Sequence, residues 1–512
     1  MIVLNTEKVT AMKDVLSSPA NNDNTAAIVV EGNPGDDITI IVQKKDNPAK
    51  TITTSGITSS STFTQIATEI KDAFDQTDGA SGTFATNTSL QVTLDRNIVK
   101  LKAIDPNVDI TEYTLFVRDP DFGGFVEFDT DTSVTGGSNP SASTTANLKT
   151  ISRGSINVIN QKLQKASDLP KLGSLDGYVV NIVGIDEQNT LANYYVKWSA
   201  KKQIWEETIE PGLKHQIDET TMPHFLIKTG QTAAGVGKFQ FVAAGDSSLT
   251  NQRSAKSYSD RLVGDDDSNP IPSFINKRIV DISFFRNRLV YLGEDSLVMS
   301  RSNDYFNLFS SSAISTRNDD PIDIFIGTNF SVLPRFMEQY QGGIIVFTEN
   351  AQFVVYSADQ SLTPATVRLE KITDYKVNED VHPVRLGENT YFADSLGNNA
   401  VIRKYIVKDN KLVKDAISIT DHVDSYIPKD LKFITGIPNK GMIILAPLND
   451  AKTLYVYFSH TQGGKLVQSA WSKFTFNFDI FGAVVFDNDL YFIDKSGENR
   501  NISKLDLFNN YK

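Results

Sequence analysis

Residues 281–309 read DISFFRNRLVYLGEDSLVMSRSNDYFNLF, and residues 318–329 read NDDPIDIFIGTN. Short apolar runs separated by polar turns in the first stretch predict strands at 282–285, 289–292 and 297–299. Arg286 and Asn287 are expected to form the tight turn between the first two strands, and residues 293–295 the next turn. The stretch therefore predicts a β-meander, the unit from which larger sheets and propeller blades are built.

This strand-turn-strand pattern recurs from about residue 279 onward. Its polar turns are centred near Asn287, Gly342, Glu388, Lys440 and Asn488, at steps of 46 to 55 residues. Strands are expected after these turns at 289–292, 344–347, 390–393, 442–445 and 490–493, with partner strands at 297–299, 352–356, 402–405, 454–457 and 502–505. Repeats of this length favour β-propeller blades, because radial stacking buries both faces of each blade. A β-sandwich is the alternative, since the repeats share little sequence.

The segment before this repeat has a different pattern. Residues 21–150 predict a small α+β module with strands at 28–30, 38–44, 51–53, 90–94, 98–101 and 113–117, and residues 35–36 can turn between the first two. Thr62 and Gln65 form a capping box that opens a helix to about Phe74, with Ile66, Ile70 and Ala73 on its apolar face. The module ends in a run of Ser, Thr, Gly and Asn at 132–145, which is typical of a linker or exposed loop.

Two further units complete the expected organisation. Residues 151–275 predict a β-rich domain, with a hairpin between 195–198 and 203–205. Residues 1–20 resemble the back half of a blade, with strands at 2–4 and 9–12 around a polar turn at 5–8 and no front half. The sequence thus predicts a mainly β chain, in which a β-propeller-like platform at 276–512 accompanies an inserted α+β module and a further β-rich domain.

Composition narrows the classes of function. The 512 residues contain no cysteine, which excludes disulfides, thiolate metal sites and cysteine nucleophiles. The formal net charge is −12, whereas tight binding to DNA phosphates normally requires a basic face. The longest apolar runs have strand length, far below the roughly 20 residues of a membrane span, and residues 1–4 lack a secretory start. We therefore expect no membrane span and a chain that is made and kept in a cytoplasm.

No pattern of catalytic or metal-binding residues stands out. The five histidines (His215, His224, His382, His422 and His460) are far apart, and none has a second histidine at a ligand spacing. Residues 230–238, GQTAAGVGK, fail the phosphate-loop pattern and predict a hairpin loop. The acid pairs Asp119 with Asp121 and Asp129 with Asp131 are better explained as solvated loops than as a glycosidase pair or a calcium site. The aromatics Tyr194, Tyr195, Trp198 and Trp205 predict core packing rather than base stacking, because no excess of basic residues accompanies them.

Several short motifs resemble the nozzle family, or tail tubular protein B, of short-tailed podovirus-type bacteriophages. The resemblance rests on the strand FFRNRL at 284–289, the pair at 300–301, the YFN cluster at 305–307 and DDPID at 319–323. Further matches lie at 222–224, 351–354, 419–423 and 426–428, in the order that the family has. The motif residues taken as the family signature and as candidates for assembly are Phe284, Phe285, Arg286, Asn287, Arg288, Asp319, Asp320 and Pro321.

The resemblance implies a structural virion protein with no cofactor and no catalytic residue. Such a chain forms a homo-hexameric ring at the distal end of the tail, contacts an adaptor or gatekeeper ring and tail fibres, and gates DNA ejection without binding DNA tightly. A companion chain supplying the missing propeller strands is a further expected partner, because family members extend beyond both ends of this chain. For the motif itself, the residues favour two core aromatics, two charged turn residues, acids that cap or pair with an arginine, and a proline that starts an edge strand. Packing between subunits is the functional alternative.

Two other classes of function remain open at this point. One is a tail-associated hydrolase that acts on envelope glycan through an acid pair such as Asp119 and Asp121. The other is a propeller-type binding module. The sequence favours the structural tail protein over both, because its motifs are collinear with those of the nozzle family.

Overall fold

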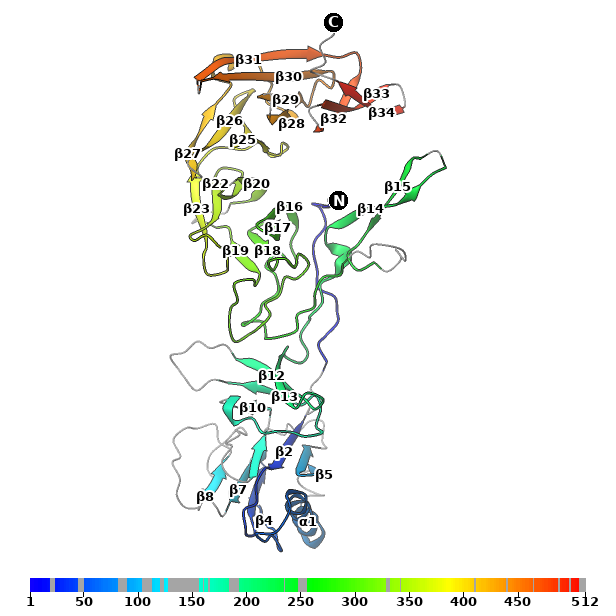
Figure 1. Ribbon diagram of the computed structural model, residues 1–512, viewed down its shortest axis with the longest axis vertical. Coiled ribbons are helices and arrows are strands. Elements are labelled where there is room, and N and C mark those ends of the chain that lie inside the picture. Colours follow the sequence, from blue (N-terminus) through cyan, green and yellow to red (C-terminus); the bar gives the residue numbers. More distant parts are fainter. Residues whose placement is uncertain are drawn as a thin grey trace.

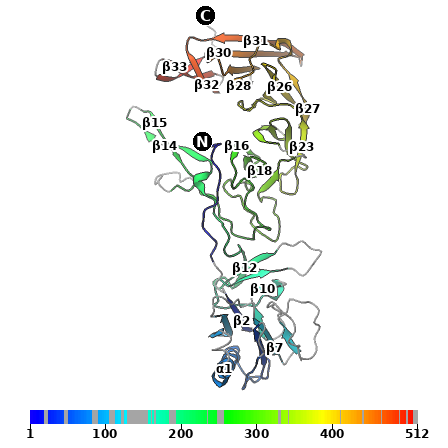
Figure 2. The ribbon, with the colours of Figure 1, turned by 180° about the vertical axis from the view of Figure 1, so that it is seen from behind.

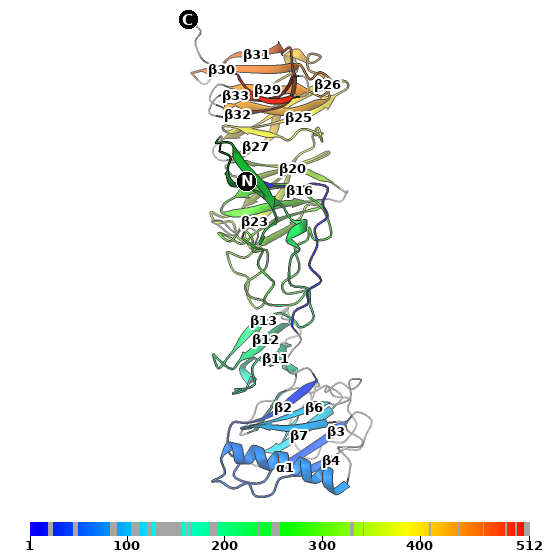
Figure 3. The same ribbon diagram turned by 90° about the vertical axis from the view of Figure 1, so that its right-hand side faces the viewer.

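The computed structural model shows a mainly β chain, elongated along one axis (Figures 1 and 3). It describes residues 1–18, 24–44, 50–81, 90–103, 113–119, 124–127, 156–159, 161–163, 166–183, 193–233, 235–246, 256–327, 332–340, 342–408, 411–438, 441–463, 465–486, 489–496 and 499–505. Helix α1 and strands β2 to β8 lie at one end of the long axis, and β28 to β34 lie at the other. No helix among these residues is long and apolar enough to cross a membrane.

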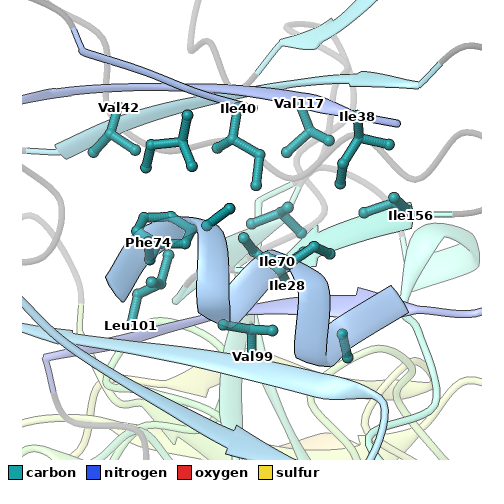
Figure 4. Close-up of a cluster of buried hydrophobic side chains, with 14 of the residues drawn as sticks. Ile28, Ile38, Ile40, Val42, Ile70, Phe74, Val99, Leu101, Val117 and Ile156 are labelled. Carbon is teal, nitrogen blue, oxygen red and sulfur yellow. The ribbon is translucent and has the colours of Figure 1, made fainter. Parts of the chain in front are cut away.

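The end that carries α1 contains two antiparallel four-stranded sheets around the helix. One has the order β5 (Leu90–Asp95), β6 (Ile98–Ala103), β2 (Thr25–Val30), β9 (Ile156–Ile159), and the other β4 (Lys50–Thr53), β3 (Thr39–Lys44), β7 (Tyr113–Asp119), β8 (Gly124–Glu127). Figure 4 shows Ile70 and Phe74 of the helix lying between side chains of β3 and β7 and side chains of β6. The apolar face predicted for the helix is therefore the face that it buries.

The start of α1 follows the predicted capping box, whereas its end does not follow the prediction. The Thr62 backbone N–H donates to Gln65 Oε1 at 2.8 Å, and the Gln65 N–H donates to the Thr62 hydroxyl at 3.3 Å. The helix (Phe63–Ser81) continues about two turns beyond the expected end at Phe74. Strands β2 and β3 also lie in different sheets, so residues 35–36 connect two sheets rather than two neighbouring strands.

A third sheet lies next to this end of the molecule. Its order is β10 (Lys162–Leu163), β11 (Val179–Ile182), β12 (Tyr194–Ser199), β13 (Ile204–Thr208), and the 3-10 turn η3 (Ala166–Asp168) precedes β11. The predicted hairpin is confirmed, since β12 pairs with β13 and Trp198 lies opposite Trp205. Trp198 is buried in a core that also contains Ala27 and Val29 of β2, so this sheet packs against the α1-containing part.

From residue 279 onward the chain builds one antiparallel sheet after another, as the repeat predicts. The strands, each paired with the next within its sheet, are β16 (Ile279–Phe285), β17 (Arg288–Gly293), β18 (Ser296–Met299), β19 (Ile322–Phe325); β20 (Pro334–Tyr340), β21 (Gly343–Thr348), β22 (Gln352–Ser357), β23 (Val367–Thr373); β24 (Val384–Leu386), β25 (Asn389–Leu396), β26 (Asn399–Lys408), β27 (Lys411–Ser418); β28 (Leu431–Ile437), β29 (Met442–Pro447), β30 (Thr453–Gln462), β31 (Lys465–Thr475); and β32 (Asp479–Phe486), β33 (Asp489–Ser496), β34 (Asn499–Leu505). The 3-10 turn η5 (Asp421–Val423) lies between β27 and β28. Figures 1 and 2 show these sheets following one another along an arc.

Each sheet in this row shares a hydrophobic core with the next. Successive residues of a strand point to opposite faces, so Ile344 belongs to the core shared with the preceding sheet and Ile345 to the core shared with the following one. Ile443 and Ile444 divide in the same way. This burial of both faces explains why strands such as β17 and β21 are apolar at nearly every position. The first strands also lie side by side, β16 with β20, β20 with β24, β24 with β28 and β28 with β32.

The chain's first residues differ from their prediction. Strand β1 (Ile2–Val3) pairs with β14 (His224–Gln231), which pairs in turn with β15 (Gly237–Val242). The second expected strand, at 9–12, does not continue this sheet: Val9 bridges to Arg278 and Met12 to Ile217. The described residues 1–18 therefore do not form two neighbouring strands of one blade, and the partner of β1 is β14 of the same chain. The short 3-10 turn η4 (Glu219–Thr221) leads into β14.

The sheet β1–β14–β15 packs against the first sheet of the row. Ile2 and Phe225 share a core with Leu289, Tyr291 and Val298. The predicted hairpin at 230–238 is confirmed: Gly230 pairs with Lys238 and Gln231 with Gly237 at the end of the β14–β15 hairpin. The Ser- and Thr-rich run at 132–145 and the turn centres Lys440 and Asn488 lie outside the described residues.

Candidate assembly site around the Arg286–Asn287 turn

The turn between β16 and β17 is a two-residue hairpin loop, and its first residue is Arg286, an uncommon residue for such a turn. Phe285 pairs directly with Arg288, and both Arg286 and Asn287 have positive φ, 44° and 59°. Positive φ at both positions defines the type I′ turn, which matches the twist of paired strands. Arginine is rare in this conformation. The Arg286 guanidinium donates a hydrogen bond to the Gln360 carbonyl at 3.0 Å and lies 5.5 Å from the centre of the Phe285 ring.

Arg288 is buried inside its own chain, with 1% of its surface exposed. Its guanidinium donates to backbone carbonyls of Ser300 at 2.7 Å, Asp320 at 2.6 Å and Asn318 at 3.0 Å. Burial lowers the pKa of Arg288 from its usual value, and the carboxylates of the 319–320 pair oppose that shift. The side chain therefore joins β17 to two loops that follow β18.

The acids of the DDPID motif hold the second of these loops in place. Arg301 forms an ion pair with Asp319 and lies 3.8 Å from the buried carboxylate of Asp320. Asp320 also accepts hydrogen bonds from the Arg317 N–H at 2.7 Å and the Ser311 N–H at 3.2 Å. Burial raises the pKa of Asp319, but the hydrogen bond and the charge of Arg301 lower it more, so this pKa lies below its usual value. Acids that cap a turn and pair with an arginine were expected here.

The remaining signature residues divide between the interior and the surface. Pro321 directly precedes β19, the outermost strand of its sheet, where a missing N–H is tolerated. Phe285 is buried, whereas Phe284 is 43% exposed and stacks edge-to-face on Tyr305 at 4.6 Å. The expectation of two core aromatics is wrong for Phe284, because adjacent residues of a strand face opposite sides. Phe284 and Arg286 thus form the surface of this motif, while Arg288 and Asp320 support it from within.

A second polar cluster joins three neighbouring sheets, and sequence analysis missed it. Asp281 of β16 accepts hydrogen bonds from the Met337 N–H at 2.8 Å and from His382 Nε2 at 3.0 Å. Burial opposes the charge on His382, yet the hydrogen bond to Asp281 raises its pKa to about 9. Burial raises the pKa of Glu338 to about 7, and charge repulsion from Asp281 adds to that shift.

The repeat offered a signal for this cluster. Glu338 follows Asp281 by 57 residues (338 − 281), and His382 follows Glu338 by 44 (382 − 338), close to the step of the repeat. Asp281 of β16, Glu338 of β20 and His382, just before β24, meet where the first strands lie side by side. No local motif marks these three residues, so the signal becomes visible only once the stacking of the sheets is known.

Three of the aromatic residues considered for base stacking are buried or hydrogen-bonded within the chain. Trp198 is buried, the Trp205 indole donates to the Pro170 carbonyl at 2.9 Å, and the Tyr195 hydroxyl donates to Glu210 at 2.7 Å. Asp119 ends β7, whereas Asp121, Asp129 and Asp131 lie outside the described residues. Within the described ranges, no three His, Asp or Glu side chains come together as a metal ion would require.

Comparison with known proteins gives this site its context. The family model for the bacteriophage nozzle protein matches residues 126–512, which is more than half of the chain and includes the whole row of sheets. The chain belongs to the bacteriophage nozzle protein family. This member of the nozzle family is 30% identical over 358 residues to tail tubular protein gp12 of Escherichia phage T7. That alignment covers 69% of this chain and 43% of the T7 protein, so it spans less than half of the relative's length.

Solved structures resemble this nozzle family member only weakly. Hsv2 of Kluyveromyces lactis has a TM-score of 0.27 at 13% identity, covering 45% of this chain and 74% of its own. A putative 6-phosphogluconolactonase from Bacteroides uniformis has a TM-score of 0.27 at 12% identity, covering 72% and 94%. Similarity at this level does not bear on the function of the chain.

Proposed function

We propose that this chain is a structural subunit of a short phage tail, forming a nozzle-like ring at its distal end. The observation that carries the proposal is the family match over residues 126–512, which includes the Arg286–Asn287 turn and all of the stacked sheets. The name of the T7 relative, a tail tubular protein, points to the same location. The protein is then a virion component without catalysis, assembled in the host cytoplasm before it joins the tail.

The row of stacked sheets is proposed to be a β-propeller-like platform. Its support is the repeated four-stranded meander, the core shared by each neighbouring pair and the line of adjacent first strands. We propose the divisions 1–20, 21–150, 151–275 and 276–512 for the chain, with β14 and β15 contributing to the sheet of β1. A companion chain or segment that adds further strands remains part of this proposal.

Six copies in a ring, an adaptor or gatekeeper ring and tail fibres are the proposed partners. Such a ring would carry 6 × −12 = −72 formal charges, which favours placing acidic loops on a water-filled channel wall. Acidic walls repel DNA phosphates and let the genome pass without binding. We expect no band shift of duplex DNA at sub-micromolar ring concentration and physiological salt. A shift that weakens steeply with added salt would instead indicate a ring that holds DNA.

Gold-labelled antibody against the purified chain tests the location. The proposal predicts label at the distal end of the tail in intact virions, with none on capsids that lack tails. Label confined to capsids, or virions without the protein, would contradict it. Asp121, the partner of Asp119 in the acid pair considered for a glycan hydrolase, lies outside the described residues.

A further inference from the structure

A cavity of about 330 Å³ lies between the sheets β24–β27 and β28–β31. Its walls combine the face of β25, β26 and β27 with residues of β29, β30 and β31. The strand register places Tyr391, Lys404 and Ile417 directly opposite one another, so these three side chains share one face of their sheet. All three line the cavity, together with Tyr457 from the neighbouring sheet.

The charge of the cavity is unusual for this chain. Lys404 and His422 line it, and no Asp or Glu is among the lining residues, although the chain carries 62 acidic residues. The other polar groups are neutral, and they include the hydroxyls of Tyr457 and Ser469, which lie 3.0 Å apart. The cavity therefore offers positive charge and hydroxyl donors without a carboxylate to balance them.

Lys404 carries the positive charge that no carboxylate in the cavity balances. It is half-buried, and its ammonium group makes no hydrogen bond or ion pair with any residue that the structure describes. Burial alone lowers the pKa of Lys404, with no acidic neighbour to raise it. Its neighbour Arg403, by contrast, pairs with Asp394 at 2.8 Å. A partly desolvated ammonium without a partner costs free energy that an anionic ligand would recover in part.

The rest of the lining limits the kind of anion. Apolar side chains of Ile417, Ile419, Ile443 and Leu466 form much of the wall. One lysine balances a single negative charge, so a carboxylate matches the cavity better than a phosphate group, which carries a charge of about −2 at neutral pH. The volume is at the lower end of the range for small-ligand sites.

We propose that this cavity binds a carboxylate carried on an apolar body, with Lys404 as its ion-pair partner. The carboxylate can come from a free organic acid or from an acidic residue flanked by apolar residues in a tail protein. Bound there, it would contact both sheets and tie two neighbouring units of the row together. The proposal goes beyond the nozzle function and does not depend on it.

Calorimetric titration of the full chain tests the site with two probes. The first is 4-phenylbutyrate, with its neutral amide as reference, and the second is the capped peptide Phe-Glu-Leu, with its Gln counterpart as reference. We expect the acid form of at least one probe to bind about tenfold or more tightly than its neutral reference, the factor that a charge-assisted hydrogen bond supplies. Binding of phenylbutyrate alone indicates a free acid, and tighter binding of the peptide indicates a protein carboxylate.

Two variants and a control assign the binding to the cavity. Lys404→Met should lose the preference for the acid, and Ile417→Glu should lose it as well, because a carboxylate placed opposite Lys404 would occupy the ammonium. Lys452→Met, an exposed lysine outside the cavity, should bind as the unmodified chain does. Circular dichroism checks the fold of each variant, and sedimentation checks ring formation separately. The proposal is overturned if neither acid binds, or if a folded Lys404→Met variant keeps the preference.

Discussion

At the scale of single residues, the nozzle-family motif contains two arginines that look alike in the sequence but have different surroundings in the structure. Arg286 and Arg288 are two positions apart, yet the first lies at the surface and the second is buried among carbonyls. The sequence predicted the turn and its polar character correctly. It could not assign the arginines their separate roles, because the carbonyls that accept from Arg288 come from residues 300–320, whose loops no local pattern specifies.

Replacing Arg288 with Met should destabilise the chain by about 3 kcal/mol or more, because several buried carbonyls would lose their donors. Urea unfolding followed by circular dichroism measures the loss. Arg286→Ala is the matched control, and its cost should stay below about 1 kcal/mol, since its hydrogen bond lies at the surface. An Arg288→Met variant as stable as the unmodified chain, but unable to assemble, would show that Arg288 acts between subunits instead.

Phe284 is the residue of the motif best placed to contact another copy. Phe284→Asp should leave the unfolding midpoint nearly unchanged and reduce the assembled fraction, because a desolvated, unpaired carboxylate opposes association. Analytical ultracentrifugation gives the assembled fraction. Phe63→Asp is a matched control, since Phe63 is 44% exposed at the start of α1, far from the motif in the fold. Equal loss of assembly in both variants would count against a role for Phe284.

At the scale of elements, the sequence predicted strands and turns better than it predicted their partners. The repeat marked the second and third strands of each sheet from β17 to β34 because short turns join them, and the Thr62 capping box marked the start of α1. Pairing of β1 with β14 escaped prediction, since more than 200 residues separate Ile2 from Phe225 and the strand has two residues. The contact of Asp281 with His382 escaped it for the same reason.

That cluster makes the stability of the sheet row depend on pH. Both folded-state pKa values, about 7 for Glu338 and about 9 for His382, lie above the ordinary values of 4.5 and 6.5. Proton binding therefore favours the folded state, and stability should fall as pH rises from about 5 to 9. Solvent screening reduces the contribution of His382 to this change in stability, because 48% of its side chain is exposed.

Urea midpoints measured from pH 5 to 9 test this dependence. Glu338→Gln should flatten the fall between about pH 5 and 7, and His382→Ala should flatten it between about pH 7 and 9. Glu379→Gln, which removes an exposed carboxylate paired with Arg335, serves as control and should keep the slope of the unmodified chain. Stability that rises through this range would contradict the assignment.

At the scale of the whole molecule, the row of sheets leaves large apolar side chains exposed at both of its ends. On the sheet β32–β34 these are Val484, Phe486, Ile493 and Ile502, and on the β14–β15 hairpin they are Val236 in the turn and Phe239 and Phe241 on β15. Contiguous apolar surface of this kind marks an interaction site or an aggregation hazard. Between successive sheets of the row, by contrast, the facing apolar side chains are buried in shared cores.

The purified chain should therefore associate irregularly when no partner covers these faces. Combining Phe486→Lys with Ile502→Lys should reduce the associated fraction in light scattering without lowering the melting temperature, because both side chains are already exposed. Val9→Lys combined with Leu16→Lys is the control, because both side chains are exposed away from these faces, and it should leave the associated fraction unchanged. A uniform monomer of the unmodified chain at high concentration would argue that these faces need no cover.

We propose that copies of this chain form a closed ring at the tip of a phage tail. Electron cryomicroscopy of intact tails measures this arrangement most directly. We expect six copies around one axis, the row of stacked sheets in each copy, and the surface of Phe284 and Arg286 within reach of the neighbouring copy. Density that places the chain as an isolated monomer, or in a part of the virion away from the tail channel, would contradict it.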